Sequence, residues 1–198
     1  GSMRASGPAL LVLLAAGLSP AQHPFPVDTS FIPVPLRWQH HSPDAARGPA
    51  NCLVAWESQN ELLAARVSPD RYVIDVGPLE LGDGHTPAVA AGYSLFLVAS
   101  EYREAIRAAR ITAGGVLLDS TPFPVSHGAG TDPAVGFNGT CFLVAWSDGD
   151  VRAVRVLPDG TLLDTADITV SNAPDRQEHP TVSFDGTNWL IAWQDMRA

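Results

Sequence analysis

Histidines and carboxylates gather at four places in the chain, each directly before a proline. The residue pairs are His41-Ser42, His85-Thr86, Thr131-Asp132 and Glu178-His179. Imidazole nitrogens and carboxylate oxygens are common ligands of divalent metals, and they also hydrogen-bond polar ligands. A fold that brings these places together would create a metal or polar-ligand site. Its ligands would be His41, His85, Asp132, Glu178 and His179.

A second candidate site involves tryptophans that stand apart from the regular pattern described below. Trp38 and Trp189 are such residues, and Trp189 follows the polar residues Asp185 and Asn188. Ligand sites commonly combine aromatic surfaces with a few polar groups. We therefore expect Trp38, Asp185, Asn188 and Trp189 to be the ligand-binding residues if the protein binds carbohydrate.

Catalytic motifs are not evident in the sequence. Gly-x-Ser-x-Gly and His-Glu-x-x-His are both missing, and most aspartates and glutamates lie in turn-like contexts, where they bond their own backbone. We therefore expect no catalytic residue and no cofactor, and the sequence favours a binding module over an enzyme.

The candidate residues belong to a repeat. The block Leu-Val-Ala-Trp begins at Leu53 and Leu143, with close variants at Leu97 and Leu190, and a proline lies ten residues before each leucine. Those prolines, Pro43, Pro87, Pro133 and Pro180, are separated by 44, 46 and 47 residues. A sustained period of this length indicates a repeat architecture.

Each repeat divides into four short apolar segments joined by turn sequences such as Asn138-Gly139 and Asp159-Gly160. Valine, isoleucine, leucine and phenylalanine dominate the segments, and the glycines supply the positive φ of tight hairpin turns. Four antiparallel strands at a period near 45 predict an all-β fold of β-propeller blades. The expected divisions are blade 1 at 43–86, blade 2 at 87–132, blade 3 at 133–179 and part of blade 4 at 180–198.

The repeat resembles the short blades of secreted bacterial β-propellers. Their pattern runs Pro-x-Val, Asp/Asn-Gly-Thr, aromatic-Leu-Val-x-Trp, Arg-Val, Asp-Gly and Leu-Asp, and the third copy follows it from Pro133 to Asp164. The Trp-Asp signature of WD40 blades is missing. The stretch "SFDGTNW" at 183–189 resembles a sialidase Asp-box but is one residue short, so we interpret it as a tight turn. The propeller architecture would place the residues before each proline at one mouth of a central channel.

Arginines and tryptophans that recur with the period are expected to be structural. Arg66, Arg110 and Arg155 each close an apolar strand, and we expect them to bond turn carbonyls and the acidic residues after the Leu-Val-Ala-Trp block. Those acidic residues are Glu57, Glu101, Asp148 and Asp195. The tryptophans Trp56, Trp146 and Trp193 are expected to pack between sheets.

Composition limits the partners. The chain of 198 residues has a net charge of -9, and its twelve basic residues are all arginine. The acidic excess would repel nucleic acid. Cys52 and Cys141 fall in different repeats, so we expect two free thiols.

The N-terminus carries a predicted leader. Gly1-Ser2 resembles a cloning remnant, and residues 3–21 combine an arginine, the apolar run "PALLVLLAAGL" and a Ser-x-Ala cleavage site. This pattern is typical of a secretory signal peptide, and the run is too short to span a membrane. We therefore expect a secreted or periplasmic protein that starts near Gln22.

The segment 22–42 contains a further predicted strand. Its stretch "DTSFIPVPL" at 28–36 aligns with "DSTPFPVS" at 119–126 and "DTADITVS" at 164–171, so we expect an outer fourth strand there. About three and a half blades are fewer than most propellers contain. We therefore expect either self-association or completion by further blades.

Taken together, the sequence predicts an exported propeller module that binds or scaffolds protein or glycan ligands. The alternative is part of a propeller-type glycan hydrolase whose catalytic residues are not evident in this chain. An acidic pair that breaks the repeat pattern would distinguish the hydrolase from the binding module.

Overall fold

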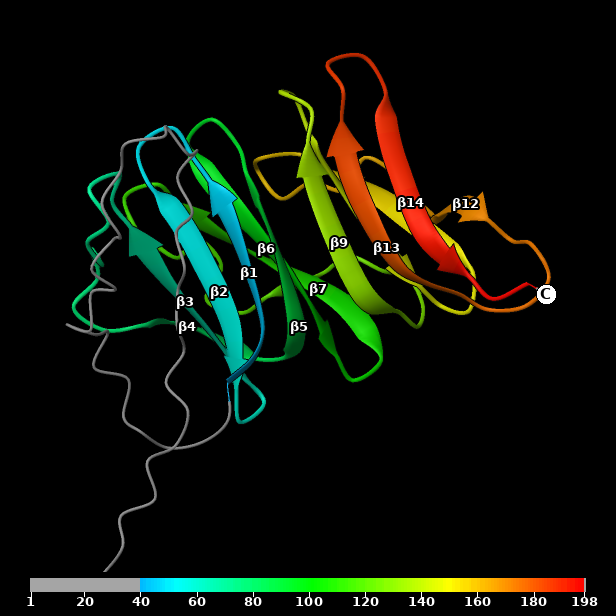
Figure 1. The fold of residues 1–198 in the computed structure, drawn as a ribbon, viewed down its shortest axis with the longest axis horizontal. Helices are drawn as coiled ribbons and strands as arrows, with labels where there is room; N and C mark the ends of the chain where they lie inside the picture. Colours follow the sequence, from blue (N-terminus) through cyan, green and yellow to red (C-terminus); the bar gives the residue numbers. More distant parts are fainter. Residues whose placement is uncertain (1–39, 198) are drawn as a thin grey trace, which may run out of the picture.

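The computed structural model describes residues 40–197, which form antiparallel sheets only (Figure 1). Three sheets have four strands each and a fourth sheet has two, and within each sheet the paired strands are consecutive in the sequence. This confirms the predicted all-β fold and the four strands per repeat. The predicted leader 3–21, the predicted strand 28–36 and Trp38 lie outside the described residues.

We call the four sheets blades 1 to 4 in chain order. Blade 1 contains β1 (His40–Arg47), β2 (Cys52–Ser58), β3 (Glu61–Val67) and β4 (Leu79–Asp83). Blade 2 contains β5 (His85–Ala91), β6 (Leu95–Tyr102), β7 (Ala105–Thr112) and β8 (Phe123–Pro124). Blade 3 contains β9 (Thr131–Phe137), β10 (Phe142–Ser147), β11 (Val151–Val156) and β12 (Ile168–Ser171). Blade 4 contains β13 (Gln177–Phe184) and β14 (Trp189–Asp195).

The hairpins form at the predicted turn sequences. In the turn between β13 and β14, Gly186 has a φ of 102°, a conformation that favours glycine. The Oδ1 atom of Asp185 accepts hydrogen bonds from the backbone N–H groups of Thr187 and Asn188, both at 2.7 Å. The stretch that resembles an Asp-box is therefore a tight turn, as predicted.

Successive blades pack face to face, with their first strands side by side in the order β1, β5, β9 and β13 (Figure 1). Apolar clusters fill the three spaces between blades. Trp146 is fully buried between blades 2 and 3, which confirms its predicted packing role. Gly130 is required beside it, because a Cβ atom there would lie 2.5 Å from Cδ1 of Trp146. Cys52 and Cys141 are free thiols, as predicted.

The recurring arginines form ion pairs with aspartates of the same blade. Arg66 binds Asp75 and Arg110 binds Asp119, each with an Nη2–Oδ1 distance of 2.6 Å. Arg155 binds Asp164 in the same way, at 2.5 Å. In all three pairs the aspartate also accepts a hydrogen bond from the backbone N–H of its arginine.

The predicted acidic partners Glu57, Glu101, Asp148 and Asp195 were therefore wrong. The register explains the difference, because Arg66 lies opposite Leu53 whereas Glu57 lies opposite Leu62, four residues before Arg66 in β3. Four residues of strand cover about 13 Å, which places the two side chains at opposite ends of the hairpin. The chain after β3 instead turns back, and Ile74 donates its backbone N–H to the carbonyl of Arg66. That turn brings Asp75 beside the guanidinium.

Two of these arginines also reach the next blade. Nη1 of Arg66 donates to the carbonyl of Ala113 at 3.0 Å, and Nη1 of Arg110 donates to the carbonyl of Pro158 at 3.3 Å. Both carbonyls lie in the turn after the third strand of the following blade. The prediction that the recurring arginines bond turn carbonyls is confirmed for Arg66 and Arg110.

Candidate ligand site at the first strands of the blades

The residue before each repeat proline has the same unusual backbone conformation in all four blades. Ser42, Thr86, Asp132 and His179 have φ values of 46°, 45°, 50° and 51°. The strand pairing shifts register across each of them. A left-handed residue followed by a proline, which has no N–H to donate, is typical of a β-bulge that redirects a side chain. These residues therefore lie inside strands β1, β5, β9 and β13, not in loops that enter the blades.

A cavity of about 470 Å³ lies along these bulges. All four blades contribute to it, each through the residue before its proline, the proline itself and the next one or two residues. The polar side chains in its wall are those of Ser42, Asp44, Thr86, Asp132, His179 and Thr181. Its apolar side chains include Val89, Val135 and Val182. The cavity therefore combines hydrogen-bonding groups with apolar surface.

The polar side chains of the cavity are arranged across blade boundaries. Nδ1 of His179 lies 3.3 Å from Oδ2 of Asp132, which joins blade 4 to blade 3. Oδ2 of Asp44 accepts a hydrogen bond from the backbone N–H of Val89 at 2.7 Å, which joins blade 1 to blade 2. Oγ1 of Thr86 is buried and has no hydrogen-bond partner within residues 40–197. That oxygen is shielded from solvent, so it lies behind the surface of the cavity wall.

Asp44 was missed in the sequence, although it breaks the repeat pattern. The position after the proline is alanine in blades 2 and 3, at Ala88 and Ala134, and threonine in blade 4, at Thr181. Only the bulge shows that this position lines the same cavity as the residue before the proline. A comparison of the four repeats at that one position would have singled out Asp44.

The five residues predicted as metal ligands do not gather at one point within residues 40–197. No group of three or more histidine, cysteine, aspartate or glutamate side chains is arranged to hold a metal ion in the described part of the chain. Asp132 and His179 line the cavity, but His41, His85 and Glu178 do not. Adjacent residues of a strand point to opposite sides, and these three residues stand one position earlier than the cavity-lining set.

Those earlier positions have other partners. Nδ1 of His85 lies 2.9 Å from Oε1 of Glu57, which joins blade 2 to blade 1. Glu178 forms an ion pair with Arg176, and His41 is exposed opposite Glu57. These contacts stabilise the junctions between strands and blades instead of gathering at one point.

Glu101 is a further titratable group near the cavity. It lies opposite His85 in the β5–β6 ladder. Burial raises the pKa of Glu101, the charge of His85 opposes that rise, and the nearby charges of Asp132, Glu104 and Glu57 add to it. A carboxyl group that keeps its proton to higher pH can donate a hydrogen bond, whereas an ionised one can only accept.

Of the residues predicted to bind carbohydrate, Asp185, Asn188 and Trp189 do not line this cavity, and Trp38 lies outside the described residues. Asp185 and Asn188 are exposed in the β13–β14 turn. Trp189 is half-buried, with its ring 5.2 Å from that of Phe184, and it packs against Leu143 and other apolar residues of blade 3. The structure gives these residues turn and packing contacts, and their role in ligand binding stays a prediction.

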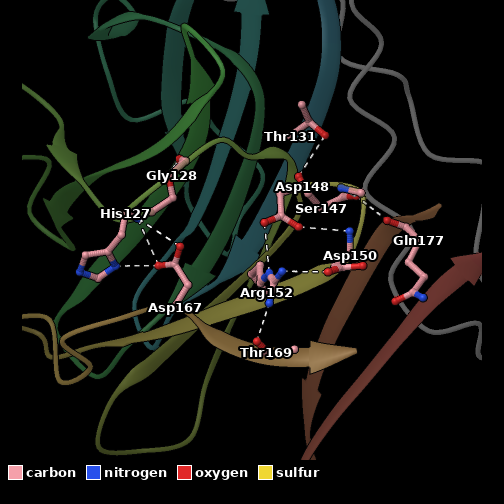
Figure 2. A network of polar contacts seen from close by, with 12 residues as sticks. His127, Gly128, Thr131, Ser147, Asp148, Asp150, Arg152, Asp167, Thr169 and Gln177 are labelled. Atoms are coloured by element: carbon pink, nitrogen blue, oxygen red, sulfur yellow. Dashed lines mark hydrogen bonds and ion pairs between the residues drawn. The ribbon is translucent and has the colours of Figure 1, made fainter. Parts of the chain in front are cut away.

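A network of polar contacts lies in blade 3 and at its junction with blade 4 (Figure 2). Ser147 donates a hydrogen bond to the backbone carbonyl of the buried Gln177, at the start of β13. Arg152 binds Asp148 at 3.1 Å and Asp150 at 2.8 Å, and it also contacts Thr169 of β12. The Ser147–Gln177 bond thus joins β10 to β13, the strand that carries His179, whereas the contacts of Arg152 stay within blade 3.

Comparison with known proteins shows the fold and no family. No family model and no curated protein matches the sequence. Among solved structures, the chain is similar to the subtype N11 neuraminidase-like protein of A/flat-faced bat/Peru/033/2010, with a TM-score of 0.51 and 13% identity over 76% of this chain. It is also similar to an exo-1,5-alpha-L-arabinanase from a bovine ruminal metagenomic library, with a TM-score of 0.52 and 12% identity over 79% of this chain. A third match is the subtype N10 neuraminidase-like protein of A/little yellow-shouldered bat/Guatemala/060/2010, with a TM-score of 0.50 and 10% identity over 78% of this chain.

The chain spans 44%, 69% and 59% of the lengths of these three proteins, respectively. At such low identity the matches establish a shared β-propeller architecture of repeated antiparallel sheets. Residues 40–197 include no helix long and apolar enough to cross a membrane.

Proposed function

We propose that this protein is a β-propeller binding module and that the cavity along β1, β5, β9 and β13 binds a sugar unit of a glycan. The observation that carries the proposal is the repeated bulge, which brings a polar side chain from each of four blades to one cavity. A cavity of about 470 Å³ lies within the size range of small-molecule sites.

The chemistry of the wall favours a hydroxyl-rich ligand. Asp44 and Asp132 supply acceptors, the imidazole of His179 can donate or accept, and the hydroxyl of the exposed Thr181 can do both. Sugar hydroxyls also donate and accept, so they can satisfy each of these groups. Two aspartates in the wall disfavour an anionic ligand, because like charges at close range repel.

Binding of saccharides to the purified protein, followed by ligand-observed NMR and calorimetry, tests this proposal. The names of the matched proteins suggest the first panel, namely 1,5-α-L-arabinan fragments and glycosides of neuraminic acid, together with common neutral oligosaccharides. We expect a neutral saccharide to bind, and we expect Asp132→Asn and Thr181→Val each to weaken binding by about tenfold, which corresponds to the loss of one hydrogen bond.

The matched control is Asp70→Asn, because Asp70 is exposed in the turn after β3 and lies outside the cavity. Absence of binding across the panel would refute the proposal, and so would binding that Asp132→Asn and Thr181→Val leave unchanged. Release of reducing sugar, lost in both Glu101→Gln and Asp132→Asn, would instead favour a glycan hydrolase.

We further propose that the protein is exported, on the basis of the leader sequence at residues 3–21. N-terminal sequencing of the protein secreted by its native host should begin at Gln22. An intact N-terminus in the cytoplasmic fraction would contradict export.

A further inference from the structure

One face of blade 1 is buried although no described blade lies on it. Val54, Trp56, Leu63, Ala65 and Val67 are each at most 7% exposed. They form a cluster whose members all come from β2 and β3, on the face that points away from blade 2. Blade 1 stands at one end of the row of described blades (Figure 1). A layer from outside residues 40–197 is therefore needed to cover this face.

Blade 3 shows what covers the same face within the repeat. Its equivalent residues, among them Val144, Trp146 and Val154, are fully buried against blade 2. The covering side chains include Phe123 and Val125, which lie in β8 and directly after it. The fourth strand of one blade thus packs its apolar side chains on the next blade.

The segment 28–36 has the sequence of such a fourth strand. When Asp28 is aligned with Asp119, Ile32 takes the position of Phe123 and Val34 takes the position of Val125. The connection to the next blade also has a similar length. Pro133 lies eight residues after Val125, and Pro43 lies nine residues after Val34.

We propose that residues 28–36 bind this buried face of blade 1, with Ile32 and Val34 in contact with the cluster of Val54, Trp56, Leu63, Ala65 and Val67. The N-terminal segment then serves as the fourth strand of the layer that precedes blade 1. This inference does not depend on the proposed sugar site.

The two free cysteines report on this packing within a single molecule. Cys52 is half-buried and packs at the edge of the cluster, whereas Cys141 is buried in blade 3. We expect Ile32→Asp and Val34→Asp in the full chain to speed the alkylation of Cys52 by monobromobimane about tenfold or more, because the local cover is lost. The alkylation rate of Cys141, measured by mass spectrometry of the same samples, should not change. Ser30→Asp is the matched control, because Ser30 aligns with the exposed Thr121.

Three results would overturn the proposal. The first is an unchanged Cys52 rate in both variants. The second is a faster Cys52 rate only in Leu11→Asp or Leu14→Asp, which would assign the cover to the leader. The third is a Cys52 rate that rises on dilution of the unaltered protein, which would assign the cover to a second copy. If the aspartate variants unfold and both cysteines react faster, the milder variants Ile32→Ala and Val34→Ala are tested instead. The alkylation rate of Cys52 is again compared with that of Cys141.

Discussion

The arginine that joins blade 2 to blade 3 should be worth more stability than its equivalent in blade 3. The guanidinium of Arg110 donates to Asp119 at 2.6 and 2.9 Å and to the carbonyl of Pro158 in the next blade at 3.3 Å. Arg155 binds Asp164 with similar geometry, but the structure records no contact from Arg155 to blade 4 within residues 40–197. The side chain of Arg110 is 17% exposed, and that of Arg155 is 46% exposed.

We expect Arg110→Ala to lower the free energy of unfolding by about 2–3 kcal/mol, because it leaves a partly buried carboxylate and a carbonyl without their donor. Arg155→Ala also leaves a carboxylate without its donor, because the Asp164 side chain is 11% exposed and that of Asp119 is 12% exposed, but it breaks no bond to the next blade and should cost about 1–2 kcal/mol. The difference of about 1 kcal/mol is the contribution of the hydrogen bond between blades, and for a domain of this size it corresponds to a gap of about 2–4 °C in melting temperature. Urea unfolding of the two variants, followed by circular dichroism with the slope held in common, measures both values.

Equal losses in the two variants would refute this reasoning, since they would show that the contact with the next blade contributes nothing. A larger loss for Arg155→Ala would refute it as well. Arg66→Ala serves as a second measurement, because Arg66 also donates to a carbonyl of the following blade and should behave like Arg110.

Three further outcomes are expected. Burial alone would raise the pKa of Asp119, but hydrogen bonds from Arg110 lower it, and hydrogen bonds from Arg155 lower the pKa of Asp164. The stabilisation from these ionised carboxylates is complete above about pH 4 and is lost as the pH falls through their lowered folded-state pKa values. Thermal melts should therefore show a decrease in melting temperature in acid, and Asp119→Asn should make that decrease smaller. Gly130→Ala should destabilise the protein by more than about 2 kcal/mol, because the new Cβ would overlap the indole packed against it, whereas Gly128→Ala, with open space around its Cβ, should leave the melting temperature unchanged. Zinc or calcium in about hundredfold excess should not shift the melting temperature, and a stabilising shift would show that the described residues do form a metal site.

Local sequence was enough to predict the blades. Turn sequences such as Asp185-Gly186, the alternation of strands and turns, and the spacing of the prolines all act over a few residues, and the structure confirms four strands per repeat. The burial of Trp146 was predictable as well, because a large apolar side chain that recurs at one strand position must pack against the neighbouring sheet.

Contacts between strands and between blades depended on the three-dimensional arrangement. The ion pair of Arg66 with Asp75 depends on how the chain turns back after β3, and strand register excludes Glu57. The same holds for the cavity. The left-handed residue before each proline, such as Asp132, shifts the pairing by a bulge, and that shift separates the cavity-lining residues from His85 and Glu178 one position earlier. Residue spacing along a strand does not reveal such a bulge, because it forms only when the proline, which lacks an N–H, is paired against a neighbouring strand.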